Sequence, residues 1–296
     1  MSGGNDLEKI ISGLDALNIN IRRMADAIAP ETDWRIFSEF RAFKVYSIAG
    51  RYRIKGIPIY DPVRLAELKG VDGILRRLRE NTIQLIEGLP CNNVLLYGPR
   101  GTGKSSAVKA LLNEYSKQGL RMIEMERDAL LHIFDIANII RQRPEKFIVF
   151  CDDLAFSEED NSYRRLKAVL EGGLEIRPDN MIICATSNRR HLMPERSEDN
   201  VPAYKSSELH AADTLEEKLS LSDRFGLRLG FFNFDSDTYL TIVRNYAALR
   251  KIKMTEEELE HAAMIWSLEH GSFSGRTARQ FIDDLEGRLK AGAKGD

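Results

Sequence analysis

A glycine-rich segment between an apolar run and a helical one carries the strongest chemical signal in the sequence. It reads Gly98, Pro99, Arg100, Gly101, Thr102, Gly103, Lys104, Ser105, and it fits the pattern of a phosphate-binding loop. Glycines let the backbone wrap around phosphate oxygens, so successive amides and the N-terminus of the next helix can hold the anion. We expect Lys104 to reach the β- and γ-phosphates of a nucleotide and Ser105 to ligate Mg²⁺. Because both flanking elements are present, a chance glycine-rich turn is disfavoured.

Polar side chains follow two further apolar runs. Asp152 and Asp153 come directly after residues 147–151, and Asn188 follows residues 181–187. In open α/β sheets, ligands bind at the carboxyl ends of the strands. We expect Asp152 to hold Mg²⁺ through its water shell and Asp153 to orient or deprotonate an attacking water. Asn188 would hydrogen-bond the γ-phosphate or that water, although Ser and Asn at a strand end also commonly start a turn.

Two arginines complete the candidate set. Arg224 comes just before the last apolar run, where its planar cation could reach the γ-phosphate bound by a neighbouring subunit. Arg279 lies in the first turn of the last predicted helix, on a segment that could cover the nucleotide. Either arginine taken singly reads as a surface salt bridge. Their order after the glycine-rich loop and the acids favours a role at the site.

The elements that position these residues alternate short apolar runs with amphipathic helices from about residue 68. Five strands are predicted, at residues 94–97, 120–125, 147–152, 181–186 and 227–232. Helices are predicted between them, at about residues 104–117, 129–141 and 163–171. This alternation is typical of an α/β fold with a parallel sheet covered on both faces. We therefore expect an α/β nucleotide-binding domain over residues 68–234.

Beyond residue 234 the pattern is wholly helical, so residues 235–296 are predicted to form a helical lid domain. Helix-start signals recur there, at Asp235 or Ser236, at Thr255 with Glu258, and at Thr277 with Gln280. Residues 195–222 form a long polar connection, of a kind that is often functional.

Residues 1–67 are predicted to be a small, mainly helical N-terminal extension. Apolar residues there recur at alternating steps of three and four, namely Leu7, Ile10, Leu14, Leu17, Ile21, Met24 and Ile28. This apolar seam packs either on the rest of the same chain, or on a partner protein or a second copy of the chain. Residues 34–60 interleave aromatic and basic side chains. They form either a small core with solvated cations or a surface that stacks bases and neutralises phosphates.

Composition limits the class of protein. The chain has 296 residues, with 43 Lys and Arg against 45 Asp and Glu, a balance that is typical of ordinary globular proteins. The net charge therefore provides no overall positive field that would attract nucleic acid. No apolar run reaches the length of a membrane helix, and the N-terminus lacks the features of a secretory signal. We expect a cytoplasmic protein without membrane partners. The three cysteines stand far apart, which indicates neither disulfides nor a zinc site.

The ordered set of loop, paired acids, polar strand end, Arg224-Phe225 pair and lid arginine resembles the AAA+ ATPase superfamily over about residues 65–290. Four stretches are similar to a group of bacterial predicted AAA+ ATPases described only as a domain of unknown function, at residues 93–106, 150–154, 185–192 and 274–281. The resemblance implies a five-stranded AAA+ core with ATP and Mg²⁺ as cofactors. It also adds Ser106 to the cofactor-binding residues of the loop.

Residues 152–156 and 224–226 are also similar to the bacterial replication initiator and its helicase-loader relatives, in which ATP binding acts as a conformational switch. This resemblance implies that residues 68–72 flank adenine, with Val71 as a binding residue. Most family members place Glu where this chain has Asp153, so the shorter carboxylate implies slow turnover. The sequence ends at Asp296, just beyond the lid, so we expect no initiator-type domain that reads duplex DNA.

Together these features predict an ATPase that forms a homo-oligomer with Arg224 acting in trans, and that remodels or loads a macromolecular partner chosen by residues 1–67. One alternative is an ATP-gated module that binds single-stranded nucleic acid through residues 34–60, with a steep salt dependence. Another is a nucleotide switch that does not hydrolyse ATP, which Asp153→Glu would distinguish. A protein unfoldase is disfavoured, because residues 126–135 lack the aromatic and glycine pair of such enzymes. For the lid, Arg279 is favoured over Arg276 because its spacing to later apolar residues matches the initiator relatives.

Overall fold

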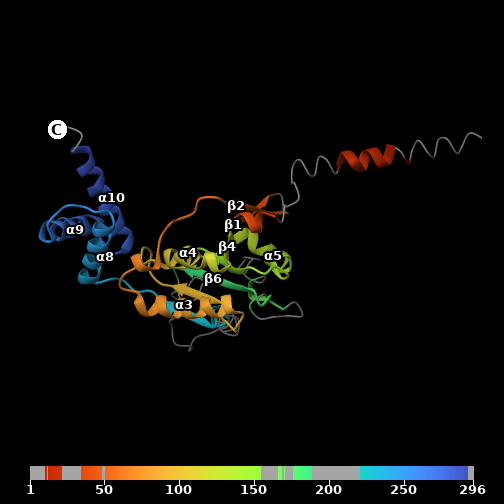
Figure 1. Ribbon diagram of the computed structural model, residues 1–296, viewed down its shortest axis with the longest axis horizontal. Coiled ribbons are helices and arrows are strands. Elements are labelled where there is room, and N and C mark those ends of the chain that lie inside the picture. The colour runs from red at the N-terminus through yellow and green to blue at the C-terminus, as the bar shows by residue number, and fades with distance from the viewer. Residues whose placement is uncertain are drawn as a thin grey trace, which may run out of the picture.

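The computed structural model describes residues 11, 13–21, 35–48, 51–154, 166–168, 170, 176–188 and 221–292 (Figure 1). The strands are β1 (Ala42–Ile48), β2 (Arg51–Ile57), β3 (Val94–Tyr97), β4 (Leu120–Met125), β5 (Lys146–Cys151), β6 (Met181–Ser187) and β7 (Leu227–Gly230). The α-helices are α2 (Ile36–Glu39), α3 (Asp72–Glu87), α4 (Lys104–Tyr115), α5 (Ile133–Ile140), α8 (Ser236–Leu249), α9 (Glu256–His270) and α10 (Gly275–Gly292). A 3₁₀ segment, η3 (Arg127–His132), leads into α5. Among the described residues, no helix is both long and apolar enough to cross a membrane.

The strands form one seven-stranded sheet in the order β2-β1-β4-β5-β6-β3-β7. Within it β1 and β2 pair antiparallel, and the other neighbouring strands pair in parallel. Both faces are covered, which explains why the central strands read as continuous apolar runs. Every residue of β6 is buried. Since β3, β5 and β6 run in the same direction, the segments that follow them meet at one edge of the sheet.

Two apolar clusters hold helices against the two faces. On one face, α3 and α4 pack through residues such as Leu78 and Leu111. On the other face, η3 and α5 pack through Leu130 and Ile136, and Phe37 of α2 joins the same cluster. The α/β layering predicted from the sequence is therefore confirmed, with β3, β4, β5, β6 and β7 at the predicted strand positions.

The predicted count of five strands is wrong, because β1 and β2 extend the same sheet beyond β4. They lie in the aromatic and basic stretch that was assigned to a mainly helical extension. Phe43, Val45 and Ile54 are buried in the core on the α5 face, with Val45 directly opposite Ile54. Aromatic and cationic residues between them obscure this period of two in the sequence. The predicted domain boundary at residue 67 stays a prediction, and the hairpin before it belongs to the central sheet.

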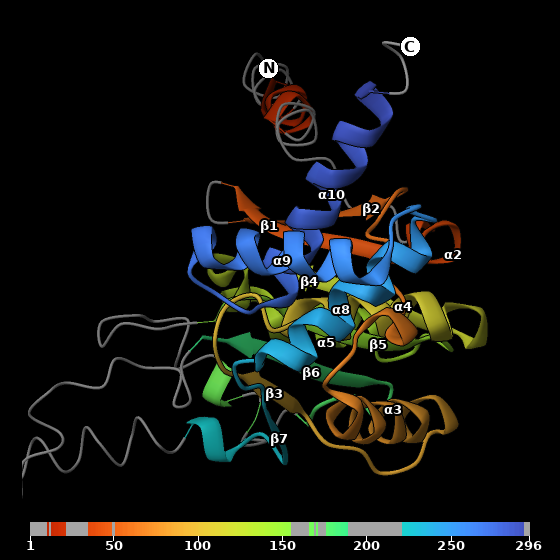
Figure 2. The ribbon, with the colours of Figure 1, turned by 90° about the vertical axis from the view of Figure 1, so that its left-hand side faces the viewer.

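The last three helices form a bundle with a core of its own, built around Tyr239, Val243, Ala263 and Phe281. Figure 1 shows α8, α9 and α10 grouped at one end of the molecule, and in Figure 2 they lie in front of the sheet. We call residues 235–292 the lid.

The helix starts of the lid confirm two predicted signals and correct a third. Asp235 caps α8 by accepting a hydrogen bond from the backbone of Thr238, and the capping box of Thr255 is complete. The capping box predicted at Thr277 is wrong. Helix α10 already begins at Gly275, and the Thr277 amide donates to Ser274 Oγ at 3.1 Å, so Ser274 is the cap.

Only part of the N-terminal heptad segment belongs to the described residues. Residues 13–21 are helical, and Leu14 and Leu17 are 56% and 55% exposed. In this described part the apolar seam therefore does not pack on the sheet or the lid. Most of the polar connection at 195–222 and of the helix expected at 163–171 lies outside the described residues.

Gly98 occupies the tightest backbone position at the end of β3. Its φ is +135°, and a Cβ atom there would lie 2.0 Å from the backbone oxygen of Phe231. Gly98→Ala is therefore expected to lower the free energy of unfolding by about 3 kcal/mol or more. In Gly287→Ala, the matched control within α10, the new methyl meets no atom within 4 Å, and we expect a gain of about 0.5–1 kcal/mol. Urea unfolding measures both, and an unchanged midpoint for Gly98→Ala would contradict this description.

Candidate functional site

The glycine-rich loop, residues 98–105, connects β3 to α4 at the edge where the parallel strands end. Gly98, Gly101 and Gly103 have φ values of +135°, +80° and +100°, a region that favours glycine. Gly103 is the N-cap of α4, so the loop closes directly above the first turn of that helix. The free amides and the helix dipole of this turn make the loop a receptor for an anion.

Lys104 is the most enclosed cation of the loop, at 7% exposed. Its Nζ donates to the Gly98 oxygen at 2.6 Å, to the Pro99 oxygen at 2.7 Å and to Asn188 Oδ1 at 3.1 Å. Burial lowers the pKa of Lys104, the neighbouring carboxylates oppose this effect, and the arginines of the site add to it. The ammonium group is thus desolvated and surrounded by neutral oxygen acceptors.

Asp152 joins the glycine-rich loop to the end of β5. Its Oδ1 accepts a hydrogen bond from Ser105 Oγ at 2.5 Å and another from Thr186 Oγ1 at 2.6 Å. Hydroxyl and carboxylate oxygens are ligands that suit Mg²⁺, which proteins usually hold with few side chains together with phosphates and water. Within the described residues there is no group of three or more His, Cys, Asp or Glu for a metal. The donor set at Ser105 and Asp152 therefore fits a cation shared with a phosphorylated ligand.

Asp153 is held in an unusual conformation by its neighbours. Its φ is +49°, in the left-handed region, and its amide donates to Thr186 Oγ1 at 2.8 Å. Its Oδ1 accepts from Asn188 Nδ2, and its Oδ2 lies 3.7 Å from Arg100 Nη2. A chain of hydrogen bonds thus connects Lys104, Asn188 and Asp153, the residues predicted to meet here.

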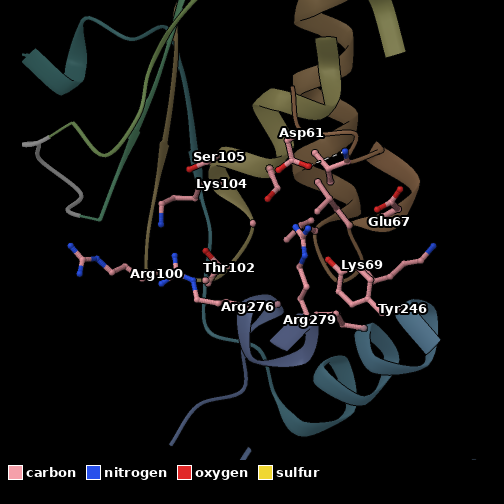
Figure 3. A pocket seen from close by; sticks show the side chains of 18 of the residues that line it. Asp61, Glu67, Lys69, Arg100, Thr102, Lys104, Ser105, Tyr246, Arg276 and Arg279 are labelled. Carbon is pink, nitrogen blue, oxygen red and sulfur yellow. Dashed lines mark hydrogen bonds between the residues drawn. The ribbon is translucent and has the colours of Figure 1, made fainter. Parts of the chain in front are cut away.

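The glycine-rich loop forms one wall of a cavity of about 900 Å³. Figure 3 shows Thr102, Lys104 and Ser105 on one side of it, residues of the 61–69 segment across from them, and lid residues closing the remaining side. Apolar residues also line the cavity, among them Ile242 of α8 and, from the segment before α3, Val63, Leu68 and Val71. Asn113 fixes that segment by donating to the Asp61 and Val63 oxygens, both at 2.8 Å. Charged and apolar side chains in one cavity suit a ligand that carries both phosphate and an aromatic base.

The cavity brings together most of the residues predicted for the site. Its lining includes Val71, Arg100, Gly101, Thr102, Gly103, Lys104, Ser105, Ser106, Asp152, Asp153, Asn188 and Arg279. Gly98 and Pro99 contribute through the oxygens that Lys104 contacts. Arg224 is not among the lining residues. It precedes β7, whose Leu227 pairs with Val94 at the start of β3, so it lies at the opposite edge of the sheet.

Three contributors to this region were missed in the sequence or left undecided. Thr186 is 1% exposed and bonds both acidic residues, but in the sequence it is one of three successive polar residues at the end of a strand, of which only Asn188 was chosen. Tyr246 lines the cavity from α8 and carries no motif. Arg276 lines it beside Arg279. The spacing of three residues on one helix was the available signal that both arginines share a face.

The Thr186 hydroxyl is predicted to stabilise the paired acids. Thr186→Val keeps the shape but removes the donor to Asp152 and the acceptor for the Asp153 amide, so we expect a loss of about 2 kcal/mol in the free energy of unfolding. Thr186→Ser keeps the hydroxyl and loses one methyl, and we expect a loss of about 1 kcal/mol or less. Denaturant unfolding of both variants provides the comparison. A serine variant less stable than the valine variant would show that Thr186 acts through packing alone.

Comparison with known proteins identifies a family and structures with a similar fold. Residues 38–289 match the model of a family described as a protein of unknown function, DUF815. The Holliday junction branch migration motor RuvB of Thermotoga maritima is similar in fold, with a TM-score of 0.52 and 15% identity over 78% of this chain and 67% of that chain. A second structure of that motor, with a point substitution, gives a TM-score of 0.52 and 18% identity over 79% and 68%.

A stretch of 90 residues is 33% identical to the replication factor C large subunit of Staphylothermus marinus. It covers 30% of this chain and 21% of that protein, so the match spans about a fifth of the relative's length. The family match covers most of the chain, and the fold and the sequence motifs agree with it. The chain therefore belongs to the DUF815 family.

Proposed function

We propose that this protein binds ATP with Mg²⁺ in the cavity at the glycine-rich loop and hydrolyses it slowly in order to remodel or load a macromolecular partner. The observation that carries the proposal is the meeting of Lys104, Ser105, Asp152, Asp153 and Asn188 in a cavity that apolar side chains also line. In this proposal the apolar lining residues, with Val71, take the adenine. The loop amides and Lys104 take the phosphates.

The hydrogen bonds in the site suggest how its residues would act. A γ-phosphate would replace the Gly98 and Pro99 oxygens as the acceptor for Lys104 Nζ, which gives the buried cation an anionic partner. Ser105 and Asp152 would hold Mg²⁺, which neutralises phosphate charge as the phosphoryl group is transferred. Asn188 would turn from Asp153 and Lys104 towards the γ-phosphate or the attacking water.

Slow turnover follows from the environment of Asp153. Its carboxylate already interacts with Asn188 and Arg100, so these contacts compete with its orientation towards an attacking water. The aspartate side chain is also one methylene shorter than glutamate. Both features lower the fraction of time that the carboxylate spends in a position to act on water.

Arg224 is proposed to act on the cavity of a neighbouring copy. It lies at the edge of the sheet opposite its own cavity and is exposed, while Leu221 and Phe225 on either side of it are buried. Buried residues on both sides fix the direction in which the exposed Arg224 side chain leaves the backbone. A fixed direction suits a guanidinium group that must meet a phosphate bound by the neighbouring subunit. The proposed assembly is therefore a homo-oligomer.

The partner is proposed to be chosen by residues 1–67, with residues 68–234 as the nucleotide-binding domain and residues 235–296 as the lid. The separate apolar core of the lid supports the second boundary. RuvB is a branch migration motor and the Staphylothermus marinus relative is a replication factor subunit, so we infer that the partner is a macromolecular complex. We also propose that the protein is cytoplasmic.

A second candidate function is ATP-gated binding of single-stranded nucleic acid by the β1–β2 hairpin. One face of it places Tyr46 opposite Arg53 and Lys44 opposite Lys55, with Lys55 Nζ 5.7 Å from the Tyr46 ring centre. Aromatic rings next to cations are typical of surfaces for single strands. Lys44, however, already pairs with Glu126 at 2.9 Å, which reduces the local positive charge. We therefore rank this function second.

Arg224→Ala is predicted to abolish ATP turnover while the variant still binds nucleotide, because its own cavity is intact. In solution, ATP is expected to drive assembly of the wild-type chain relative to ADP or no nucleotide. Mixing Arg224→Ala with Lys104→Ala should restore part of the turnover, since an intact cavity then meets an intact arginine in some interfaces. Mass measurement and phosphate release test these points together.

Two results would contradict this assignment. A wild-type chain that stays monomeric with ATP and turns it over at a rate that Arg224→Ala does not change would exclude a shared site. Mixed variants that assemble but stay inactive would exclude action of Arg224 in trans.

A further inference from the structure

We propose that residues 7–28 join copies of this chain to one another through a coiled coil, and that this contact forms without nucleotide. The sequence leaves two interpretations of this segment open, packing on the same chain or on another one. The segment lies outside residues 38–289, which match the family model. The inference goes beyond the proposed function, because this contact is separate from the nucleotide cavity and from Arg224.

The described part of the segment is a short helix that does not pack on the sheet or the lid. Residues 13–21 are helical, and in Figure 1 this helix, drawn in red, lies apart from both. Leu14, Leu17 and Ile21 are each more than half exposed. A helix shorter than about 12–15 residues is only marginally stable in water, and most helices in proteins are stabilised by packing of an apolar face. This helix therefore needs a packing partner outside the sheet and the lid.

The apolar residues have the spacing of a coiled-coil seam. Over three successive heptads they fill position a, with Leu7, Leu14, Ile21 and Ile28, and position d, with Ile10, Leu17 and Met24. In a coiled coil each of these side chains inserts between four side chains of the facing helix, so the facing helix must carry a matching repeat. A second copy of the segment carries the same repeat, residue for residue.

The distribution of charge favours identical copies as the partner. Positions e and g flank the seam, and the charges that they often carry select the partner helix. Between Leu7 and Ile28 these positions are all uncharged, namely Ile11, Gly13, Asn18, Asn20, Ala25 and Ala27. The charged residues of this stretch fall at other positions, namely Glu8, Lys9, Asp15, Arg22, Arg23 and Asp26. Identical helices can therefore meet without repulsion between like charges beside the seam, and the charges that would select a different helix are missing there.

This contact would act together with the proposed contact of Arg224. Helices that hold copies together raise the effective concentration of each cavity for the arginine of its neighbour. Three heptads are near the lower limit for a coiled coil, so we expect association through them to depend on protein concentration. ATP then adds a second contact between copies that the helices already hold. The choice of the macromolecular partner falls to the rest of residues 1–67.

Sedimentation of the full chain without nucleotide, over a range of protein concentrations, tests the proposal. The wild type is compared with Leu17→Asp, at position d of the seam, and with Ile19→Asp, at position f on the opposite side of the same helix. Ile19 is the matched control, because it is apolar and 52% exposed against 55% for Leu17. Leu17→Met is the conservative variant, and thermal unfolding checks that every variant is folded.

We expect the wild type, Ile19→Asp and Leu17→Met to self-associate as the protein concentration rises. Leu17→Asp should stay monomeric over the same range, because association would bury its carboxylate among apolar side chains. Without nucleotide, Arg224→Ala should associate as the wild type does. With ATP, Leu17→Asp should need at least about tenfold more protein than the wild type to reach half of its maximal turnover per chain, since the copies are no longer linked.

The proposal is overturned if the wild type without nucleotide stays monomeric at every concentration, the result expected of a seam that binds a different protein. It is also overturned if Leu17→Asp associates like the wild type, or if Ile19→Asp loses association to the same extent as Leu17→Asp. A wild type that associates through Leu17 but binds no ATP would leave this inference in place and remove the proposed function.

Discussion

A buried ammonium group without an anionic hydrogen-bond acceptor is the constraint on which the site depends. Lys104 is almost fully enclosed, and its hydrogen bonds end on two backbone oxygens and an amide oxygen, all neutral. A buried charge is costly unless it is well paired. The arrangement is therefore most stable when an anion enters the glycine-rich loop. The left-handed glycines and the lid arginines serve the same requirement, because they bring backbone and positive charge close to one small volume.

The paired acids depend on contacts between neighbouring strands. Residues after β5 and residues of β6 meet because the two strands are parallel neighbours, and the Thr186 hydroxyl joins them by bonding both acids. The same geometry brings Asn188 between Lys104 and Asp153. A change at the phosphate end of the cavity can thus reach the acids through Asn188 and the lid through Gly101. Short contacts, rather than a long pathway, thus connect the cavity with the acids and with the lid.

The sequence predicted the parts of this structure that depend on local pattern. The glycine-rich loop, the strands formed by apolar runs and the caps of α8 and α9 each depend on neighbouring residues in the sequence. The structure contains all of them. Contacts between distant segments were harder to predict. Thr186 gains its role only when β6 lies beside β5, and the β1–β2 hairpin becomes part of the core only when it pairs with β4. The start of α10 was misplaced because Ser274 competes with Thr277 as a cap, and packing on the glycine-rich loop favours Ser274.

The central claim is that this cavity binds ATP through Lys104, and direct titration of ATP with Mg²⁺ into the wild-type chain and into Lys104→Ala tests it most directly. The account predicts saturable binding at one site per chain for the wild type. It predicts a loss of affinity of at least about tenfold for Lys104→Ala, the effect of removing one charge-assisted contact. Equal affinity for the two chains, or no binding by a folded wild-type chain, would contradict it.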